Sequence, residues 1–177
     1  MEAYVFWHRR DPRVEREEYE KYLVRFHESF HRVKVHGFLF STSYRVSGVT
    51  WMPPGDVYED WYFIEDSGAL DRLIEAVERD TRSVHDEVAS LSLEGKGTLL
   101  ALKAGEFSKQ RRDVVTWFSK PRGVPYEKFY ASLQIKGSLW RRLLALGPSP
   151  EFCMVNLERI TIPSSIHVER EMIFPTP

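Results

Sequence analysis

Five consecutive residues of this chain, His27-Glu28-Ser29-Phe30-His31, match the H-E-x-x-H pattern of zinc hydrolases. On a helix, histidines at i and i+4 lie on one face, close enough to share a metal ion. The glutamate between them then takes a proton from the metal-bound water. This pattern is the first candidate for chemistry in the sequence, and the residues around it decide whether it can hold zinc.

The helical phase of this segment argues against catalytic zinc. With about 100° of rotation per residue, the apolar residues of the helix define a face that leaves His27 near its edge, His31 further round and Glu28 almost opposite. An outward glutamate is a poor base for a metal-bound water. The extended zincin motif also fails, because Lys34 and Gly37 stand where its glycine and third histidine belong. We therefore predict no metal and no cofactor at this segment.

The same histidines suit a different task. His27 can project into a pocket between the helix and a sheet, where an imidazole that titrates near neutral pH hydrogen-bonds a ligand or moves a proton. His8, at the end of the first predicted strand, can join it. The alternative is that both are boundary histidines, half exposed beside the core.

Composition limits the class of protein. The chain has 177 residues, of which 42% are hydrophobic and 14% aromatic, enough for a globular core. A net charge of -1 leaves no basic field, so we expect neither nucleic-acid nor membrane-surface binding. The single cysteine, Cys153, excludes an internal disulfide and cysteine-based metal sites. Since no apolar run approaches 18 residues and no signal peptide is recognisable, we expect a cytoplasmic protein.

Amide residues are scarce in this chain. Asn156 is the only asparagine, Gln110 and Gln134 are the only glutamines, and charged residues make up 29% of the sequence. Proteins of thermophiles avoid thermolabile amides and favour ion pairs. The composition therefore suggests a thermophile, which concerns habitat rather than function.

Hydrophobic periodicity predicts a βαββαβ order for residues 1–105, the split βαβ unit of ferredoxin-like folds. Asp66 and Ser67 are natural N-caps for the second helix, which breaks near residues 80–81 and stops at Gly95 and Gly97. The expected strands are 4–8, 38–46, 57–65 and 98–103, and the expected helices are 15–33 and 66–91 in two pieces.

Residues 106–177 begin the same pattern again after a polar linker, 105–113. Strand 114–118 has a tryptophan near its end, as the first strand does. The tetrapeptide Tyr126-Glu127-Lys128-Phe129 is similar in sequence to Tyr19-Glu20-Lys21-Tyr22. Only two further strands are recognisable, 152–162 and 166–174, so we predict a degenerate βαββ second half. The fold class is α+β, with two ferredoxin-like halves whose sheets pack as an α+β barrel.

Apolar residues occupy both faces of the predicted strands. Tyr4 and Phe6 point one way while Val5 and Trp7 point the other, and a sheet that faced water on one side would alternate instead. Helices can cover one face. A second sheet must cover the other, and it comes either from the second half of this chain or from another copy of it.

The chain resembles the dimeric α+β barrel superfamily, in particular its EthD-like and antibiotic-biosynthesis-monooxygenase-like groups. The resemblance covers residues 1–105 and rests on the strand–helix start with Tyr19, Tyr22, Phe26 and the histidines, leading into Val35-His36-Gly37-Phe38. It implies a pocket for a small hydrophobic or aromatic molecule between sheet and helices, and a homo-oligomer. Members include cofactor-free monooxygenases, isomerases and haem-handling proteins, so the fold alone does not select the chemistry. By the same analogy, His85 is a candidate haem ligand.

We accordingly expect a small-molecule-binding protein, with the possibility of a cofactor-independent oxygenase or isomerase acting on an aromatic or polyketide-like compound. The candidate catalytic residues are His27 and His8. The candidate ligand-binding residues are Phe6, Phe26, His31, Phe38, Trp61 and Tyr62. The alternatives are a non-catalytic oligomeric structural protein and a protein that binds metal through the H-E-x-x-H histidines or haem through His85. A polar-lined cavity at His27 of about 300 Å³ or more favours the ligand-binding hypothesis.

Overall fold

The computed structural model of this chain describes residues 1–143 and 147–175. Within them the chain forms a closed barrel of eight antiparallel strands, in the order β1-β3-β2-β8-β5-β7-β6-β4. The first half contributes β1 (Glu2–Arg10), α1 (Arg16–Arg32), β2 (Phe38–Ser47), β3 (Val57–Ile64), α2 (Ser67–Ala76), the π-helical turn η1 (Val77–Thr81), α3 (Arg82–Ser90) and β4 (Ser92–Gly105). The second half contributes β5 (Arg112–Phe118), α4 (Tyr126–Ser132), β6 (Ser138–Arg142), β7 (Phe152–Asn156) and β8 (Ile166–Phe174).

Two strand pairs join the halves into one barrel. β2 pairs with β8, and β4 pairs with β6. Within the first half the strands lie in the order β4-β1-β3-β2, and within the second half in the order β8-β5-β7-β6. Each strand therefore has the same neighbours as its counterpart in the other half. The second sheet that the apolar strand faces require comes from this chain itself.

The barrel interior is filled by the inward faces of both halves. Trp7 and Trp61 come from the first half and Trp117 and Trp140 from the second, and all four are fully buried. On β1, residues alternate as predicted: Val5 and Trp7 belong to the interior cluster, whereas Tyr4 and Phe6 pack under the helices. The period-two alternation of a strand thus serves two apolar layers.

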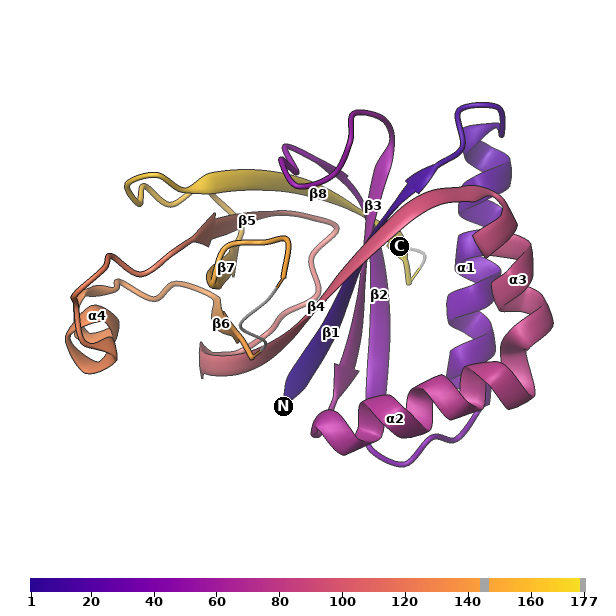
Figure 1. Cartoon of the computed structure of the whole chain (residues 1–177), viewed down its shortest axis with the longest axis horizontal. Coiled ribbons are helices and arrows are strands. Elements are labelled where there is room, and N and C mark those ends of the chain that lie inside the picture. Colours follow the sequence, from indigo (N-terminus) through magenta and orange to yellow (C-terminus); the bar gives the residue numbers. More distant parts are fainter. Residues whose placement is uncertain (144–146, 176–177) are drawn as a thin grey trace.

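Helices α1, α2 and α3 cover the outer face of the first-half sheet, while α4 lies at the far end of the molecule (Figure 1). α1 buries Tyr19, Leu23, Phe26, His27 and Phe30, which recur at the three- and four-residue spacing of an amphipathic helix. The predicted cap of α2 is confirmed, because the Asp66 carboxylate accepts a hydrogen bond from the Ala69 backbone N–H at 3.0 Å. No helix in the described residues is long and apolar enough to cross a membrane.

The second half differs from its prediction in one strand. Three strands follow α4 rather than two, because β6 was missed and the strand predicted for 152–162 ends at Asn156. β6 reads Ser-Leu-Trp-Arg-Arg, and the charged end conceals its pattern. The Arg141 guanidinium lies 4.0 Å from the centre of the Tyr126 ring and donates to Glu151, so α4 and the segment before β7 accommodate the charge. Relative to the first half, only the second helix is missing.

The glycines predicted to end the second helix lie instead inside β4. α3 ends at Ser90, and β4 begins at Ser92. A Cβ at Gly95 would lie 2.3 Å from the Phe6 ring, and one at Gly97 would lie 2.6 Å from the Tyr4 hydroxyl. The glycines therefore let two aromatic rings of β1 lie flat over the neighbouring strand.

Candidate functional site

Two histidines flank one buried carboxylate between α1 and the first-half sheet. His8 of β1 places its Nε2 atom 3.0 Å from Oδ2 of Asp60, and His27 of α1 places its Nε2 atom 3.3 Å from Oδ1 of the same residue. Asp60 belongs to β3, which pairs with β1 along its length. His27 is fully buried, and His8 and Asp60 are 4% and 2% exposed. The two predicted catalytic histidines are thus brought to a single carboxylate.

Asp60 is the charged centre of this cluster. Burial alone would raise the pKa of its carboxyl, but the charges of His8 and His27 and the hydrogen bond with His8 outweigh burial and hold this pKa well below its usual value. The Tyr62 hydroxyl also donates to Oδ2, at 3.2 Å, and its own pKa is raised by burial and by the Asp60 charge. Asp60 is therefore a carboxylate, and Tyr62 keeps its proton.

The partners of His8 determine where its hydrogens lie. Ser92 donates its hydroxyl hydrogen to the Val88 carbonyl at 2.9 Å, so the Tyr19 hydroxyl, 3.0 Å away, must donate to Ser92. Tyr19 then has no hydrogen left for His8, whose Nδ1 atom lies 2.5 Å from it. His8 must donate from Nδ1 to Tyr19 and from Nε2 to Asp60. In this arrangement both ring nitrogens of His8 act as donors, and the ring pairs with the Asp60 carboxylate.

His27 is less constrained. Its Nδ1 atom lies 2.8 Å from the Ser41 hydroxyl, and either atom can donate. Its Nε2 atom and Asp60 Oδ1 face each other without the geometry of a hydrogen bond, and neither atom has another hydrogen-bonding partner. The imidazole stacks between the rings of Tyr62 and Phe174, with centroid distances of 5.4 and 5.1 Å. Of the two histidines, His27 is the one whose hydrogen positions the surrounding contacts leave open.

The rest of the H-E-x-x-H segment does not form a zinc site. Glu28 is exposed and pairs with Arg32 along the helix at 3.6 Å, on the side away from the sheet. His31 turns back to the sheet, where its Nε2 atom accepts a hydrogen bond from the Ser41 backbone N–H at 3.3 Å. Among the described residues, no group of three or more His, Cys, Asp or Glu side chains is arranged to hold a metal ion.

Five of the six predicted ligand-binding residues lie on the helix-covered side. Phe26, Phe6, Phe38 and Tyr62 belong to the aromatic cluster under α1, and the His31 ring packs edge-on against Phe38 at 5.9 Å. Trp61 is the exception, because its side chain points into the barrel interior and donates to Glu59 at 2.6 Å. The haem candidate His85 lies on α3, half exposed, 3.2 Å from Asp86.

Sequence reasoning missed the residues that organise these histidines. Asp60, Ser41 and Tyr19 were taken as ordinary members of strands and helix. A signal was present for Asp60, since Glu59 and Asp60 interrupt the apolar strand Val57–Ile64 and every residue of that strand is buried. A carboxylate inside a two-sided apolar strand must find charged or donor partners. The identity of those partners depends on tertiary structure.

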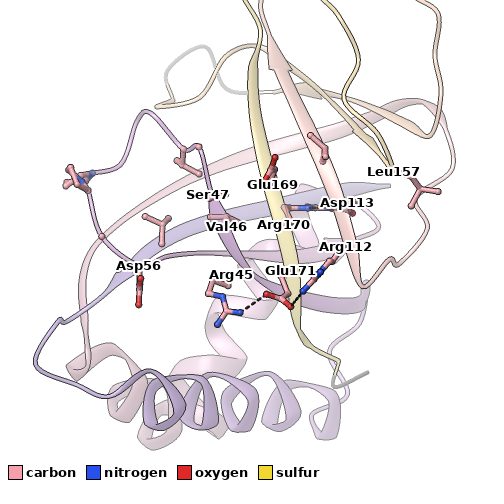
Figure 2. A pocket seen from close by; sticks show the side chains of 17 residues that line it. Arg45, Val46, Ser47, Asp56, Arg112, Asp113, Leu157, Glu169, Arg170 and Glu171 are labelled. Atoms are coloured by element: carbon pink, nitrogen blue, oxygen red, sulfur yellow. Dashed lines mark hydrogen bonds and ion pairs between the residues drawn. The ribbon is translucent and has the colours of Figure 1, made fainter.

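A cavity of about 760 Å³ lies elsewhere, between the β2–β3 loop and strands β5 and β8 (Figure 2). Its charged walls are already paired. Glu171 accepts from Arg112 at 2.9 Å and from Arg45 at 2.6 Å, and these hydrogen bonds lower the pKa of its carboxyl to about 2. A second cavity, of about 560 Å³, is lined by Gln134, Asn156 and neighbouring residues. Neither cavity reaches His8 or His27.

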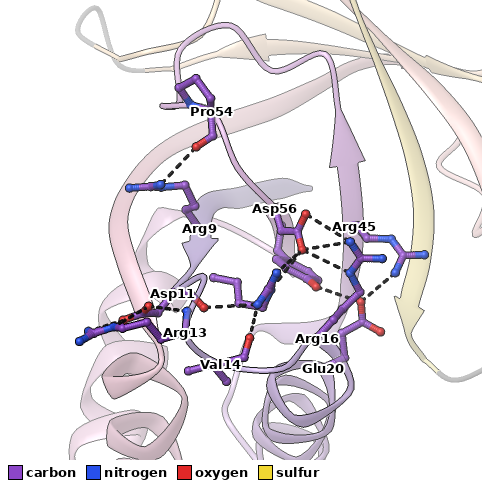
Figure 3. Close-up of polar contacts among 11 residues, drawn as sticks. Arg9, Asp11, Arg13, Val14, Arg16, Glu20, Arg45, Pro54 and Asp56 are labelled. Atoms are coloured by element: carbon purple, nitrogen blue, oxygen red, sulfur yellow. Dashed lines mark hydrogen bonds and ion pairs between the residues drawn. The ribbon is translucent and has the colours of Figure 1, made fainter.

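Ion pairs also fix the rim of the larger cavity. Asp56, at the start of β3, accepts from Arg10 at 2.7 Å and from Arg16 at 3.2 Å, so that β1, β3 and the start of α1 are tied together (Figure 3). Burial raises the pKa of Asp56, but the hydrogen bonds from the two arginines outweigh it and leave this pKa below its usual value. A charged ligand entering here would have to displace existing ion pairs.

Comparisons with known proteins identify solved structures with a similar fold but no protein that is similar in sequence. No protein-family model and no curated protein matches the chain. An anthrone oxidase-like protein of known structure is 15% identical over 96% of this chain and 72% of its own, with a TM-score of 0.53. A proposed monooxygenase from Lactobacillus acidophilus NCFM is 11% identical over 96% and 76%, with a TM-score of 0.50. At these identities the likeness is one of fold, and it agrees at that coarse level with the resemblance to monooxygenase-like barrels.

Proposed function

We propose that this chain binds a small hydrophobic or aromatic molecule between α1 and the first-half sheet, and that His27 transfers a proton to or from it. The observation that best supports this proposal is the carboxylate of Asp60 with an imidazole at each oxygen. His8 has a hydrogen-bond partner at each ring nitrogen, so we assign the proton transfer to His27, whose Nε2 atom has none. An acid or base near neutral pH is what proton abstraction from an activated C–H or O–H bond requires.

His27 Nε2 and Asp60 Oδ1 are the polar atoms that a ligand would engage. Both are buried and lack a hydrogen bond, a state that costs free energy unless a polar group fills it. A hydroxyl or carbonyl oxygen of a flat ligand fits this need, and the aromatic rings of Tyr62 and Phe174 on either face of His27 suit an aromatic body. Because His27 is fully buried, the ligand enters by displacing Phe174, next to the exposed His31.

Anthrone is a reasonable first probe, because a structural neighbour is described as anthrone oxidase-like. Its activated methylene group loses a proton to a base, and the resulting anion reacts with dioxygen without any cofactor. We expect the protein to accelerate hydrogen–deuterium exchange at this methylene without oxygen, and quinone formation with oxygen. Substituting His27→Gln should reduce both rates about 100-fold, the usual contribution of a general base. Exchange and oxidation no faster than in buffer alone would contradict the proposal for this substrate class.

A non-catalytic structural role is the second candidate. The complete burial of His27 favours it, as does the position of the two cavities described above, neither of which reaches His27. In that case no aromatic probe binds, and His27→Gln changes only stability. Isothermal titration with anthrone-like hydroxyaromatic compounds separates the two functions.

The division of the barrel into two units and its assembly into an oligomer are also matters of proposal. We propose that residues 1–105 and 106–177 are two ferredoxin-like units, since their strands share one order of neighbours. The barrel closes without a second copy, so the expected homo-oligomer would be formed through other surfaces.

A further inference from the structure

We infer that Ser41 and His31 form a proton relay that connects the buried His27 with solvent. This inference rests on the proposed function and deepens it, because it names the path by which the positive charge gained at the acid–base histidine leaves the interior. Ser41 Oγ lies 2.8 Å from His27 Nδ1 and 3.2 Å from His31 Nε2, so one hydroxyl bridges a fully buried imidazole and an exposed one.

The relay balances as two hydrogen transfers without movement of heavy atoms. When His27 takes a proton at Nε2, its Nδ1 hydrogen passes to Ser41 Oγ, and the Ser41 hydroxyl hydrogen passes to His31 Nε2. His31 then loses its Nδ1 hydrogen to water. At the end one proton has left the protein, and both neutral imidazoles carry their hydrogen on Nε2. The same steps in reverse, with a proton taken from water at His31 Nδ1 and the Nε2 hydrogen of His27 given to the bound molecule, restore the starting tautomers. In both transfers within the protein, the donor and acceptor atoms lie within hydrogen-bonding distance of each other.

The surroundings of His31 make it a transient carrier. The Ser41 backbone N–H donates to His31 Nε2 at 3.3 Å, which favours the form with a lone pair on that atom. Burial lowers the pKa of His31, and the charges of His27 and Lys109 lower it further. A His31 ring that has received a second hydrogen therefore gives one up readily, and its Nδ1 hydrogen is the one that passes to water. In its starting state, His31 can therefore accept a hydrogen from Ser41 without retaining the positive charge.

The groups that face His27 leave this route as its connection to water. Asp60 and Tyr62 of β3 lie on one side, with Asp60 already held by His8, and Phe174 of β8 covers the other. None of these three side chains offers a titratable group at the surface, since all three are buried. Ser41 is the hydrogen-bonded exit from the imidazole.

Proton exchange of the His27 ring, measured by NMR on protein labelled with 15N-histidine, tests the relay without any substrate. We expect Ser41→Ala to slow exchange of the His27 ring hydrogens with water about tenfold or more. His31→Gln, which keeps a hydrogen-bonding side chain but cannot carry the proton, should slow it similarly. The matched control is Ser43→Ala, the same change on the same face of β2 at a hydroxyl without a partner, which should leave the rate unaltered.

Backbone amide exchange in α1 and β2 separates the relay from opening of the fold. Ring exchange faster than amide exchange, and slowed in both variants, supports the relay. Unchanged ring exchange in His31→Gln, or ring exchange as slow as that of the amides in the unmodified protein, overturns it. His31 is exposed, so its variant folds even if Ser41→Ala does not. Inactivity towards anthrone would leave this result unaffected, which keeps the two proposals distinguishable.

Discussion

Asp60 shows how a strand residue becomes the centre of a site. A lone ionised carboxyl inside a protein is unstable, and the cost is met here by an imidazolium on one oxygen and a tyrosine hydroxyl beside it. The hydrogen positions on His8 follow from a chain of donors that ends at a backbone carbonyl. The same argument leaves the hydrogen positions of His27 open, because either His27 or Ser41 can be the donor in the contact between them.

Substituting Asp60→Asn should destabilise the protein strongly. The amide removes the charge that His8 is paired with, so His8 either stays buried as an unpaired charge or gives up its proton, and breaking a buried pair from one side costs about 3–5 kcal/mol. Urea denaturation at pH 7 measures the free energy of unfolding. Adding His8→Gln should recover part of the loss, because the unpaired charge disappears. A loss below about 1 kcal/mol would show that the ion pair contributes little.

The stability of the protein should fall in acid, because protonation of Asp60 removes its contribution to folding. Its pKa in the folded protein lies below the ordinary value of 3.8, so its contribution to stability is complete above that value and is lost as pH falls toward the lower folded pKa. Glu171 acts in the same direction, with a folded pKa of about 2. We expect melting temperatures that are flat from pH 7 to about pH 5 and decline steadily below pH 4. In Asp60→Asn the decline should be shallower, and an equally steep one would assign it to other carboxyls.

β4 depends on its glycines for a different reason from the one that the sequence suggested. Gly95→Ala would place a methyl group 2.3 Å from the Phe6 ring, closer than any real contact, and the ring would have to move. Overpacking of this kind costs about 1–3 kcal/mol. Thermal unfolding of Gly95→Ala should show the loss, and combining it with Phe6→Ala should give less than the sum of the two single losses. Additive losses would mean that ring and glycine are independent.

Local pattern predicted the elements that are built from long, periodic runs. α1 and the alternating faces of β1 and β3 follow directly from spacing, and the structure confirms them. β6 could not be found in this way, since a five-residue strand ending in two arginines has no clear period. The site divides similarly. His27 and His8 are conspicuous residue types, whereas Ser41 and Asp60 acquire their roles only when β2, β3 and α1 meet.

The whole molecule is a barrel closed within one chain, and its composition leads to a prediction about heat. Ion pairs link distant segments, such as Arg45 with both Glu20 and Glu171. Networks of this kind stabilise proteins mainly at high temperature. Calorimetry should give a melting midpoint above about 65 °C, the upper end of the range for mesophile domains. A lower midpoint would contradict the thermophile hypothesis drawn from composition.

Arg170 connects the two halves through the barrel interior. From β8 it donates to Asp113 of β5 with two bonds of 2.6 Å and to Glu59 of β3 at 3.0 Å, and none of its side chain is exposed. Trp7 and Trp61 also donate to Glu59, at 2.7 and 2.6 Å. Arg170 thus links strands of the two halves through buried ion pairs, within a core that is otherwise largely aromatic.

Substituting Arg170→Met should therefore weaken the barrel as a unit. The change strands the carboxylates of Glu59 and Asp113 in the core, and the loss of stability should be about 3–5 kcal/mol. The matched control is Arg159→Met, which removes the exposed partner of Glu169 and should cost less than about 1 kcal/mol. Urea denaturation followed by tryptophan fluorescence reads both, because four tryptophans line the interior. If the two variants lost equal stability, the buried ion pairs would not be what joins the halves, and apolar packing between the sheets would have to carry that role.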